Sequence, residues 1–477
     1  MVIEKLPKKD ILQFESIEKF GIWRVADYYA ACDYQICEYS LGIKLMWAEV
    51  YRYAFAECGG CLICRDEYDG VVYFDFPVAG KNGDVEAALC AIEAYCLATE
   101  TSLRFTTVPA SYLGMLSARY DGVEIQNTYR YRDYVYRCES IERFEGKKYA
   151  GQRNHLRRFQ KNYPDAIFRR LTHDDLPAIE RFAARFNENV RHFNDEALTE
   201  RESAFRILRD QAHEHFFIGC MEYRGEIIGV AIGECCGDTL VEHVEKALST
   251  DYEGVYPALF QAFVKTFGSG CTYVNREDDA GERGLRTSKL QYHPERIVTK
   301  YDIYVKNLLH FVDSIPELST ERLTLNAIQP SDAADYGRLC LDDARNRYWG
   351  YDYREDFGDR IPSGADFCRV AAEDFDARYA ANFAVRLGKR LIGEVIVYHF
   401  DFRGSAEIGV RIAPEYAGQG YGREALAAAS DWALYGLGAT KLVAQCFREN
   451  DASAKMLASL MRKIGDDGRM LRFERLV

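Results

Sequence analysis

A glycine-spaced loop near the carboxyl end of the sequence contains the residues best suited to chemistry. Gly418, Gly420 and Gly422 recur at every second position within the run from Gly409 to Glu424, just before an expected helix. A helix N-terminus leaves several backbone N–H groups without partners, and these groups attract an anion together with the helix dipole. Glycine lets the anion approach the backbone closely. The loop therefore predicts an anion-binding site.

Two common phosphate-binding loops do not fit this spacing. No Gly-Lys-Ser/Thr follows the glycines, and the Gly-x-Gly-x-Gly order departs from the dinucleotide-binding fingerprint. The surrounding pattern predicts a meander of strands at 382–387, 391–400 and 405–412, then the loop, a helix and a strand at 441–447. Asn450 then has the position and chemistry of a helix N-cap.

In this order of elements, and in the loop itself, residues 316–477 resemble the GNAT acetyltransferases, in particular the branch that acetylates ribosomal-protein N-termini. The run from Leu318 to Leu325 resembles the first strand of that branch. The resemblance implies acetyl-CoA as the cofactor and a primary amine, small-molecule or peptidyl, as the acceptor. The implied cofactor-binding residues are Val410, Arg411, Ile412, Gly418, Gln419, Gly420, Tyr421, Gly422, Arg423 and Asn450.

Acyl transfer from a thioester to an amine needs a neutral amine, a stabilised oxyanion and a proton for the leaving thiolate. By the same resemblance, Glu407 is the candidate base, directly or through a water molecule, and Ser453 is the candidate acid. The residues alone also allow a second interpretation of each. Glu407 can be a strand carboxylate that faces solvent, and Ser453 an ordinary residue in the first turn of a helix.

A second group of polar residues lies in the first two-thirds of the chain. Three runs are distinctive: 146–159, 243–247 and 273–294. Together they resemble the C-terminal domain of lysyl-phosphatidylglycerol synthases and the bacterial proteins that share it, over nearly all of residues 1–310. In that family the fold is two GNAT-like modules in tandem. The resemblance therefore implies three such modules in the whole chain.

Residues of both charge signs follow the expected strand near residue 275, where a binding cleft often opens. One interpretation is a pocket that recognises an ammonium group, as of an aminoacyl substrate. The other is a buried ion-pair network that joins two modules. The candidates for this second site are His243, Glu245, Lys246, Asn275, Arg276, Glu277, Asp278 and Lys289.

A basic patch covers residues 147–170. Residues 141–170 contain nine Lys or Arg against three Asp or Glu. Leu156, Phe159 and Tyr163 recur at helical spacing, which predicts an amphipathic helix with a cationic face. Such a face can contact the phosphates of a tRNA acceptor arm. It can equally be a solvated face that pairs with local acids.

Composition places the chain among globular proteins. It has 477 residues, 48% of them hydrophobic, and a formal net charge of -13, which gives no general attraction to nucleic acid. The sequence contains neither a secretory leader nor an apolar run of membrane-spanning length. We therefore expect a soluble, cytoplasmic protein without membrane insertion.

The cysteines favour reduced thiols over a disulfide framework, because the 15 residues are odd in number and scattered through apolar runs. The one cluster is Cys58-Gly-Gly-Cys61 followed by Cys64. Its two glycines predict a hairpin turn. A zinc site would need a second Cys or Cys/His pair at suitable spacing, and none is evident, so we expect no metal.

These observations predict an α/β protein with mixed sheets in three GNAT-like modules, at residues 1–140, 141–310 and 313–477. The predicted function is acetyl-CoA-dependent N-acetyl transfer by the last module. Two alternatives stay open for residues 1–310. The region can transfer an aminoacyl group from aminoacyl-tRNA, or it can be a non-catalytic recognition module that presents the substrate.

Overall fold

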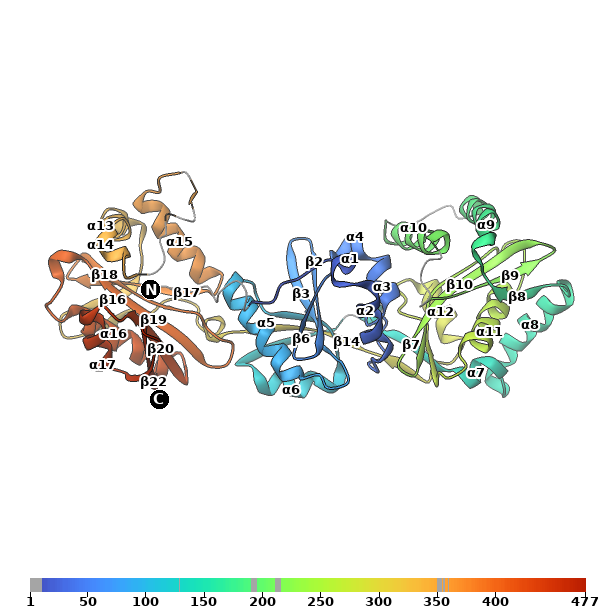
Figure 1. Ribbon diagram of the computed structural model, residues 1–477, viewed down its shortest axis with the longest axis horizontal. Coiled ribbons are helices and arrows are strands. Elements are labelled where there is room, and N and C mark those ends of the chain that lie inside the picture. Colours follow the sequence, from blue (N-terminus) through green and yellow to red (C-terminus); the bar gives the residue numbers. More distant parts are fainter. Residues whose placement is uncertain are drawn as a thin grey trace.

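The computed structural model describes residues 11–127, 129–189, 195–210, 216–349, 354, 357–358 and 360–477. Within these residues the strands form three mixed sheets. Figure 1 shows them as three lobes in a row, with the lobe that contains the first helices in the middle. We call these the first lobe, the second lobe and the C-terminal domain. None of the described helices combines the length and the apolar character that a membrane span needs.

The sheet of the first lobe has the order β1-β2-β3-β5-β14-β6, and β4 pairs with β2. Its strands are β1 (Ala54–Cys58), β2 (Cys61–Tyr68), β3 (Val71–Asp75), β4 (Val78–Ala79), β5 (Arg104–Pro109), β6 (Gly122–Gln126) and β14 (Lys300–Lys306). Its helices are α1 (Ile17–Phe20), α2 (Ile22–Ala30), α3 (Leu41–Met46), α4 (Ala48–Tyr51), α5 (Val85–Thr99) and α6 (Leu113–Arg119). The predicted hairpin turn is confirmed. The backbones of Cys58 in β1 and Cys61 in β2 lie opposite each other in the strand register, and Gly59 and Gly60 between them both have positive φ.

The sheet of the second lobe has the order β13-β7-β12-β11-β10-β9-β8. Its strands are β7 (Asp133–Arg137), β8 (Ile167–Arg170), β9 (Phe217–Tyr223), β10 (Glu226–Cys236), β11 (Thr239–Ala247), β12 (Tyr273–Asn275) and β13 (Arg296–Val298). Its helices are α7 (Cys138–Arg143), α8 (Ala150–Asn162), α9 (Leu176–Asn189), α10 (Asp195–Asp210), α11 (Val255–Phe267) and α12 (Arg283–Leu290). The amphipathic helix predicted from Leu156 and Phe159 is α8, with Phe159 buried.

The first two lobes exchange strands. β7 precedes residue 140 in the sequence but pairs with β12 and β13 of the second lobe. After β13 the chain returns, and β14 lies between β5 and β6 of the first lobe. The division between the two sheets therefore does not follow the sequence boundary drawn between residues 140 and 141.

The sheet of the C-terminal domain has the order β15-β16-β17-β18-β19-β20-β22-β21. Its strands are β15 (Leu318–Ser319), β16 (Thr324–Ala327), β17 (Ala380–Leu387), β18 (Arg390–Tyr398), β19 (Ser405–Ile412), β20 (Lys441–Phe447), β21 (Arg462–Asp466) and β22 (Met470–Leu476). Its helices are α13 (Ala333–Cys340), α14 (Asp343–Asn346), α15 (Gly364–Asp376), α16 (Tyr421–Asp431) and α17 (Asp451–Ala458). α16 packs its small buried residues Ala425 and Ala429 in one core with Ile408 of β19.

The strands predicted around the glycine loop are confirmed as β17 to β20, and Asn450 caps α17 as predicted. The single first strand expected from Leu318 to Leu325 is wrong. The run is split into β15 and β16 by a turn, in which Thr320 N–H donates to the Leu323 carbonyl over 2.9 Å. The Thr320 hydroxyl also donates to Glu424 of α16 over 2.6 Å, which holds the turn against the glycine loop.

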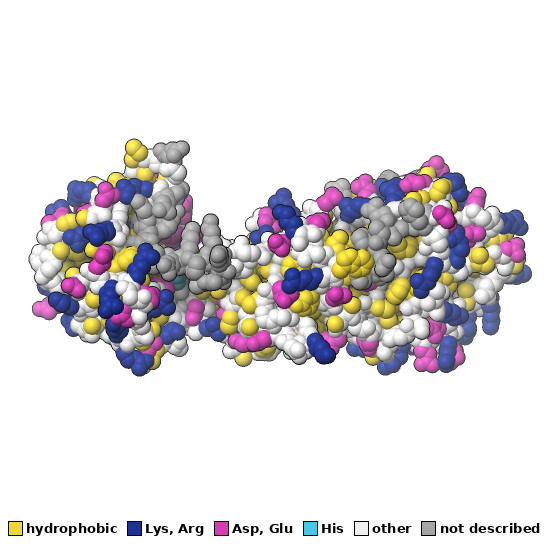
Figure 2. Space-filling view, viewed as in Figure 1, with side chains coloured by type: hydrophobic (Ala, Val, Ile, Leu, Met, Phe, Trp, Pro, Cys, Tyr) yellow, Lys and Arg dark blue, Asp and Glu magenta, His cyan; other side chains and the backbone are white. Residues whose placement is uncertain are grey.

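Each sheet contains a parallel strand pair, and within the described residues it has only one. The pairs are β3 with β5, β11 with β12 and β19 with β20. Between the two strands of each pair the chain forms a helix: α5, α11 and α16, respectively. On the face shown in Figure 2, acidic and basic side chains are interspersed over all three lobes.

Candidate active sites

Two strands of the C-terminal domain part beside the glycine loop. β19 and β20 pair from Ser405↔Lys441 to Glu407↔Val443, and their register ends there. β19 continues to Ile412, paired on its other side with β18. Among the described strands, none pairs with the β20-facing edge of β19 beyond Glu407. The backbone N–H and C=O groups of Arg411 face Glu394 of β18, whereas those of Val410 and Ile412 point to this open edge and are left for a ligand, because each such group needs a hydrogen-bond partner.

The glycine loop ends at the N-terminus of α16. Gly418 and Gly420 have φ of 77° and 83°, a region that favours glycine. Gly420 is the N-cap, and no side chain caps the helix. A Cβ at Gly422 would lie 3.4 Å from Ile412 Cγ1 and 3.5 Å from Met456 Sδ, so α16 starts close to β19 and α17. The N–H groups of the first turn are therefore free of side-chain caps at the point where β19 and β20 diverge.

Arg322 lies over this loop and was not among the predicted site residues. Its guanidinium donates to the Gln419 carbonyl over 3.0 Å, pairs with Glu424 at 2.6 Å and stacks on the Tyr421 ring at 4.5 Å. It adds positive charge next to the N-terminus of α16. The sequence signal for it was weak, because Arg322 belongs to a run that was expected to be strand.

The side chains of three predicted cofactor residues point elsewhere. Arg411 forms a buried ion pair with Glu394 at 2.7 Å and stacks on Trp349, and its backbone groups face Glu394 of β18, so neither its side chain nor its backbone is directed into the cleft. The Gln419 amide donates to the carbonyl of Glu415 over 3.4 Å. Arg423 is exposed and donates to the Ser459 hydroxyl over 3.0 Å.

Glu407 sits where β19 and β20 part. Tyr398 donates to its carboxylate over 3.0 Å and Gln445 over 3.4 Å, and His399 Nδ1 lies 3.6 Å from it. The Glu407 side chain is only 18% exposed, so it is not the solvent-facing strand carboxylate of the second interpretation. Its neighbours leave it in a polar, half-buried position that suits a general base.

Ser453 lies in the first turn of α17. Its backbone N–H donates over 3.2 Å to Oδ1 of Asn450, the residue that caps the helix. Burial raises the pKa of the Cys446 thiol, and a hydrogen bond with the Ser453 side chain opposes that rise. The Ser453 side chain is thus directed toward the buried Cys446 of β20.

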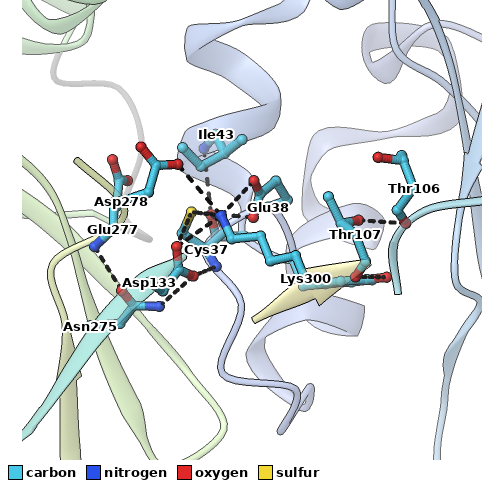
Figure 3. Close-up of polar contacts among 12 residues, drawn as sticks. Cys37, Glu38, Ile43, Thr106, Thr107, Asp133, Asn275, Glu277, Asp278 and Lys300 are labelled. Atoms are coloured by element: carbon cyan, nitrogen blue, oxygen red, sulfur yellow. Dashed lines mark hydrogen bonds and ion pairs between the residues drawn. The ribbon is translucent and has the colours of Figure 1, made fainter. Parts of the chain in front are cut away.

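A second polar cluster lies where the first two lobes meet (Figure 3). The Lys300 ammonium group lies 2.8 Å from Asp133, 2.7 Å from Glu38 and 3.6 Å from Asp278. It also donates to the Cys37 thiol over 3.3 Å. Cys37, Glu38 and Asp133 bring their ligand atoms within 4.8 Å of one another, a spacing that could hold a metal ion, but the ammonium group lies among them. The site is therefore a buried ion-pair cluster around Lys300.

His243 lies between two carboxylates in the same junction. Its ring nitrogens are 2.9 Å from Glu234 and 2.8 Å from Glu277. Glu234 also accepts from the backbone N–H of Gly42 at the start of α3, over 2.6 Å, which joins the lobes. Burial alone would lower the pKa of His243, but its hydrogen bonds with Glu234 and Glu277 outweigh burial and raise this pKa to about 9.

Arg276 joins two buried glutamates of β11. It pairs with Glu242 at 2.6 Å and also with Glu245. One oxygen of each glutamate, Oε1, has no hydrogen-bond partner within the described part of the chain. Lys289 donates to the carbonyl oxygens of Arg276, over 2.5 Å, and Asp278. Burial lowers the pKa of Lys289.

Seven of the eight predicted second-site residues therefore belong to one connected network. Lys246 is the exception, because it pairs with Glu200 of α10 at 2.6 Å. Sequence reasoning missed Cys37, Glu38, Asp133, Glu234, Glu242 and Lys300. Glu234 gave one signal, a charge inside an otherwise apolar strand. Glu242 lies on β11 of the same lobe as Arg276, whereas Asp133 and Lys300 meet Cys37 and Glu38 only because β7 and β14 are exchanged between the lobes.

The basic patch divides into paired and exposed groups. Arg158 pairs with Glu253, and Arg169 pairs with Asp175 at 2.8 Å and with Glu222 at 2.7 Å. Arg157 and Lys161 are exposed on α8 and form no ion pair with any described residue. The paired arginines fit the interpretation of a solvated face that pairs with local acids. Arg157 and Lys161 fit the interpretation of a face that contacts phosphates.

Comparison with known proteins agrees with both halves of this description. A family model described as the C-terminal domain of phosphatidylglycerol lysyltransferase matches residues 29–304, more than half of the chain. The chain belongs to this family. A model described as the acetyltransferase (GNAT) domain matches residues 322–461. The C-terminal domain is thus a GNAT domain, and the two matches support an acyltransferase.

Curated relatives cover parts of the chain. An uncharacterized protein of Mycoplasmoides gallisepticum is 26% identical over 179 residues, 36% of this chain and 56% of that protein, so the chain spans about half of its length. The uncharacterized N-acetyltransferase YoaA of Bacillus subtilis is 27% identical over 146 residues, 30% of this chain and 81% of that protein.

One solved structure shares the fold of part of this chain. It is a conserved protein of unknown function from Bacteroides thetaiotaomicron, with a TM-score of 0.56 and 23% identity. The match covers 62% of this chain and 100% of that one. At this identity the likeness concerns the fold alone.

Proposed function

We propose that the C-terminal domain transfers the acetyl group of acetyl-CoA to a primary amine. The observation that carries this proposal is the uncapped N-terminus of α16 behind Gly418 and Gly420, at the point where β19 and β20 diverge. A pyrophosphate fits the first feature and an extended pantetheine arm fits the second. Arg322 adds a positive charge beside the loop.

Binding and proton transfer are carried out by different residues of the cleft. The backbone N–H groups of residues 418–423 hold the pyrophosphate, and backbone groups of Val410 and Ile412 with the Asn450 side chain hold the pantetheine. Bound acetyl-CoA supplies the activated thioester. Glu407 removes a proton from the ammonium group of the acceptor, directly or through water, so that the neutral amine can attack, and Tyr398 holds the Glu407 carboxylate in place. The Ser453 hydroxyl supplies a proton for the departing thiolate.

We further propose that the first two lobes are GNAT-like modules. Their support is the repeated arrangement of a parallel strand pair with a helix between the strands in the sequence. Neither α5 nor α11 follows a glycine loop like that of α16. Acetyl-CoA is therefore assigned to the C-terminal domain alone.

A second candidate function belongs to the junction of the first two lobes. The partnerless oxygens of the buried Glu242 and Glu245 favour a positively charged ligand such as the ammonium group of an aminoacyl substrate. Arg157 and Lys161 offer charge to tRNA phosphates. The competing proposal is a non-catalytic junction that only presents the amine acceptor.

The decisive experiment is calorimetric titration of the full-length chain with acetyl-CoA, followed by a screen of polyamines and peptides as acceptors. Micromolar binding and release of CoA thiol with one acceptor class support acetyl transfer. Absence of binding rejects the cofactor assignment. Transfer of a labelled aminoacyl group from tRNA, without any need for acetyl-CoA, would favour the second candidate.

A further inference from the structure

One turn of the C-terminal domain is built into the first lobe. It is the connection between β18 and β19, residues 401–404. Phe402 at its tip is only 7% exposed and belongs to the hydrophobic core of the first lobe. Its carbonyl accepts from the backbone N–H of Asp121 over 2.9 Å. The next residue, Arg403, pairs with the buried Glu93 of α5 at 3.2 Å.

Residues that follow the last strand of the first lobe are in turn buried in the C-terminal domain. Leu308 and Leu309, which follow β14 of the first lobe, are buried in the core of the C-terminal domain. Asn307 donates to the carbonyl of Arg378 over 2.8 Å. The first lobe and the C-terminal domain therefore each place apolar residues in the core of the other, which fixes the turn from both sides.

The backbone of the turn is strained. Phe402 has a φ of 63°, in the region that L side chains rarely adopt, and Gly404, with a φ of 82°, supplies the second left-handed position without strain. Asp401 satisfies the N–H groups of Arg403, over 2.9 Å, and Ser405, over 2.8 Å. The Asp121 carboxylate of the first lobe lies beside Gly404, with Oδ1 3.6 Å from the position of an added Cβ, and the Gly404 backbone opposes the rise that burial gives the pKa of Asp121. Such a conformation persists when its surroundings over-determine it, and here the first lobe supplies part of those surroundings.

This turn lies directly beside the candidate base. Ser405 begins β19, and Glu407 is the third residue of that strand. On the other side of the turn, Tyr398 ends β18 and donates to Glu407, and His399 follows with a φ of 49°. The turn therefore sets the register and direction of all three side chains.

We propose that the first lobe positions Glu407 for acetyl transfer through this turn, with Asp121 and Arg403 as positioning residues. The proposal rests on the proposed function of the C-terminal domain and deepens it. It makes the first lobe a working part of the acetyltransferase site, although no residue of that lobe need touch acetyl-CoA.

The test measures turnover and cofactor binding separately in the full-length chain. Turnover is followed as CoA thiol released from acetyl-CoA, with the best acceptor of the screen or with water. For Asp121→Ala and Arg403→Ala we expect kcat to fall by about tenfold or more, because small displacements of a catalytic group are costly. The dissociation constant for CoA should stay within about twofold, since the loop of α16 is untouched.

A double-mutant cycle separates positioning from simple destabilisation. If Asp121 acts through Glu407, Glu407→Gln should cost much less in the Asp121→Ala background than in the wild type. Asp121→Asn and Arg403→Lys keep the acceptor and the cation, and they should restore turnover. Arg475→Ala, which removes a pair with Asp431 of 2.6 Å on the same domain, is the matched control.

The outcomes are distinct. Additive losses in the cycle, or turnover within twofold of wild type in both alanine variants, overturn the positioning role and leave the acetyltransferase assignment intact. A wild-type chain that neither binds CoA nor turns over acetyl-CoA rejects both proposals. A tenfold loss of kcat with unchanged CoA affinity, and with coupling to Glu407, supports the positioning role.

Discussion

The helix that follows the first strand of each parallel pair begins differently in the C-terminal domain and in the other two lobes. In the C-terminal domain, α16 starts at Gly420 without a side-chain cap. In the second lobe, α11 starts at Gly254, where an added Cβ would lie 2.8 Å from the carbonyl oxygen of His155 on α8. In the first lobe, the Asp84 carboxylate caps α5 and accepts from the Ala87 N–H over 3.1 Å.

The same arrangement of strands and helix thus gives one open anion site and two closed ones. α8 covers the start of α11, and a carboxylate occupies the start of α5, where it would repel a phosphate. What the first two lobes have instead is a buried charged junction. The comparison teaches that the function follows from the local chemistry at the helix start and not from the shared topology.

The largest effect is expected from the base of the open site. Glu407→Gln should lower kcat by roughly 10²–10⁴-fold, the usual contribution of general base catalysis, and leave CoA affinity unchanged. The matched control is Glu245→Gln at the junction, which should leave acetyl transfer unchanged. Steady-state kinetics measures both. Equal losses in the two variants would erase the distinction between the sites.

The second-largest effect is expected from a carboxylate placed at the open N-terminus of α16. Gly420→Asp places a carboxylate against the expected pyrophosphate and should weaken CoA binding by about 100-fold, close to 2.7 kcal/mol. Gly438→Asp is the matched control, because Gly438 has a nearly identical φ of 86° and no atom lies within 4 Å of an added Cβ. Calorimetry decides between them. Unchanged CoA affinity in the Gly420 variant would reject the loop assignment.

The stability of the first two lobes should depend on pH through His243. The folded-state pKa of His243, about 9, lies above its unfolded value of 6.5. The stability from the charged ring is therefore complete below about pH 6.5 and lost as pH rises toward 9. The loss is on the order of 3 kcal/mol. Urea titrations across this range measure it, and His243→Gln should flatten the profile; an equally steep profile would contradict the pairing.

The smallest effect is expected at the carboxylate that closes α5. Asp84→Ala removes an N-cap and should reduce the free energy of unfolding by about 1 kcal/mol. It should not create a second CoA site, because no glycine loop precedes this helix. Urea titration and the calorimetric stoichiometry check the two statements. A second bound CoA would show that the cap alone excludes the cofactor.

Local patterns in the sequence were sufficient for the strands and the helix starts around the glycine loop. The spacing of Gly418, Gly420 and Gly422, the alternation along β19 and the capping chemistry of Asn450 all act within a few residues. The prediction of a single strand from Leu318 to Leu325 was wrong, because the turn within this run depends on Glu424, about one hundred residues away in the sequence.

The junction of the first two lobes could be predicted only in part. The run from Asn275 to Asp278 was found as a charged strand end, but its partner Lys300 lies on a strand of the other sheet. Cys37 and Lys300 are 263 residues apart in the sequence. No local period encodes such a contact, because it follows from which strands cross between the lobes.

The position of β14 has a consequence for synthesis of the chain. This strand lies between β5 and β6, yet it is made after the whole second lobe. A nascent chain that ends before Lys300 therefore leaves β5 and β6 as facing, unpaired edges, which are liable to mispair. The first lobe can therefore close only after residue 306 has left the ribosome, when every strand of the second lobe has already been made.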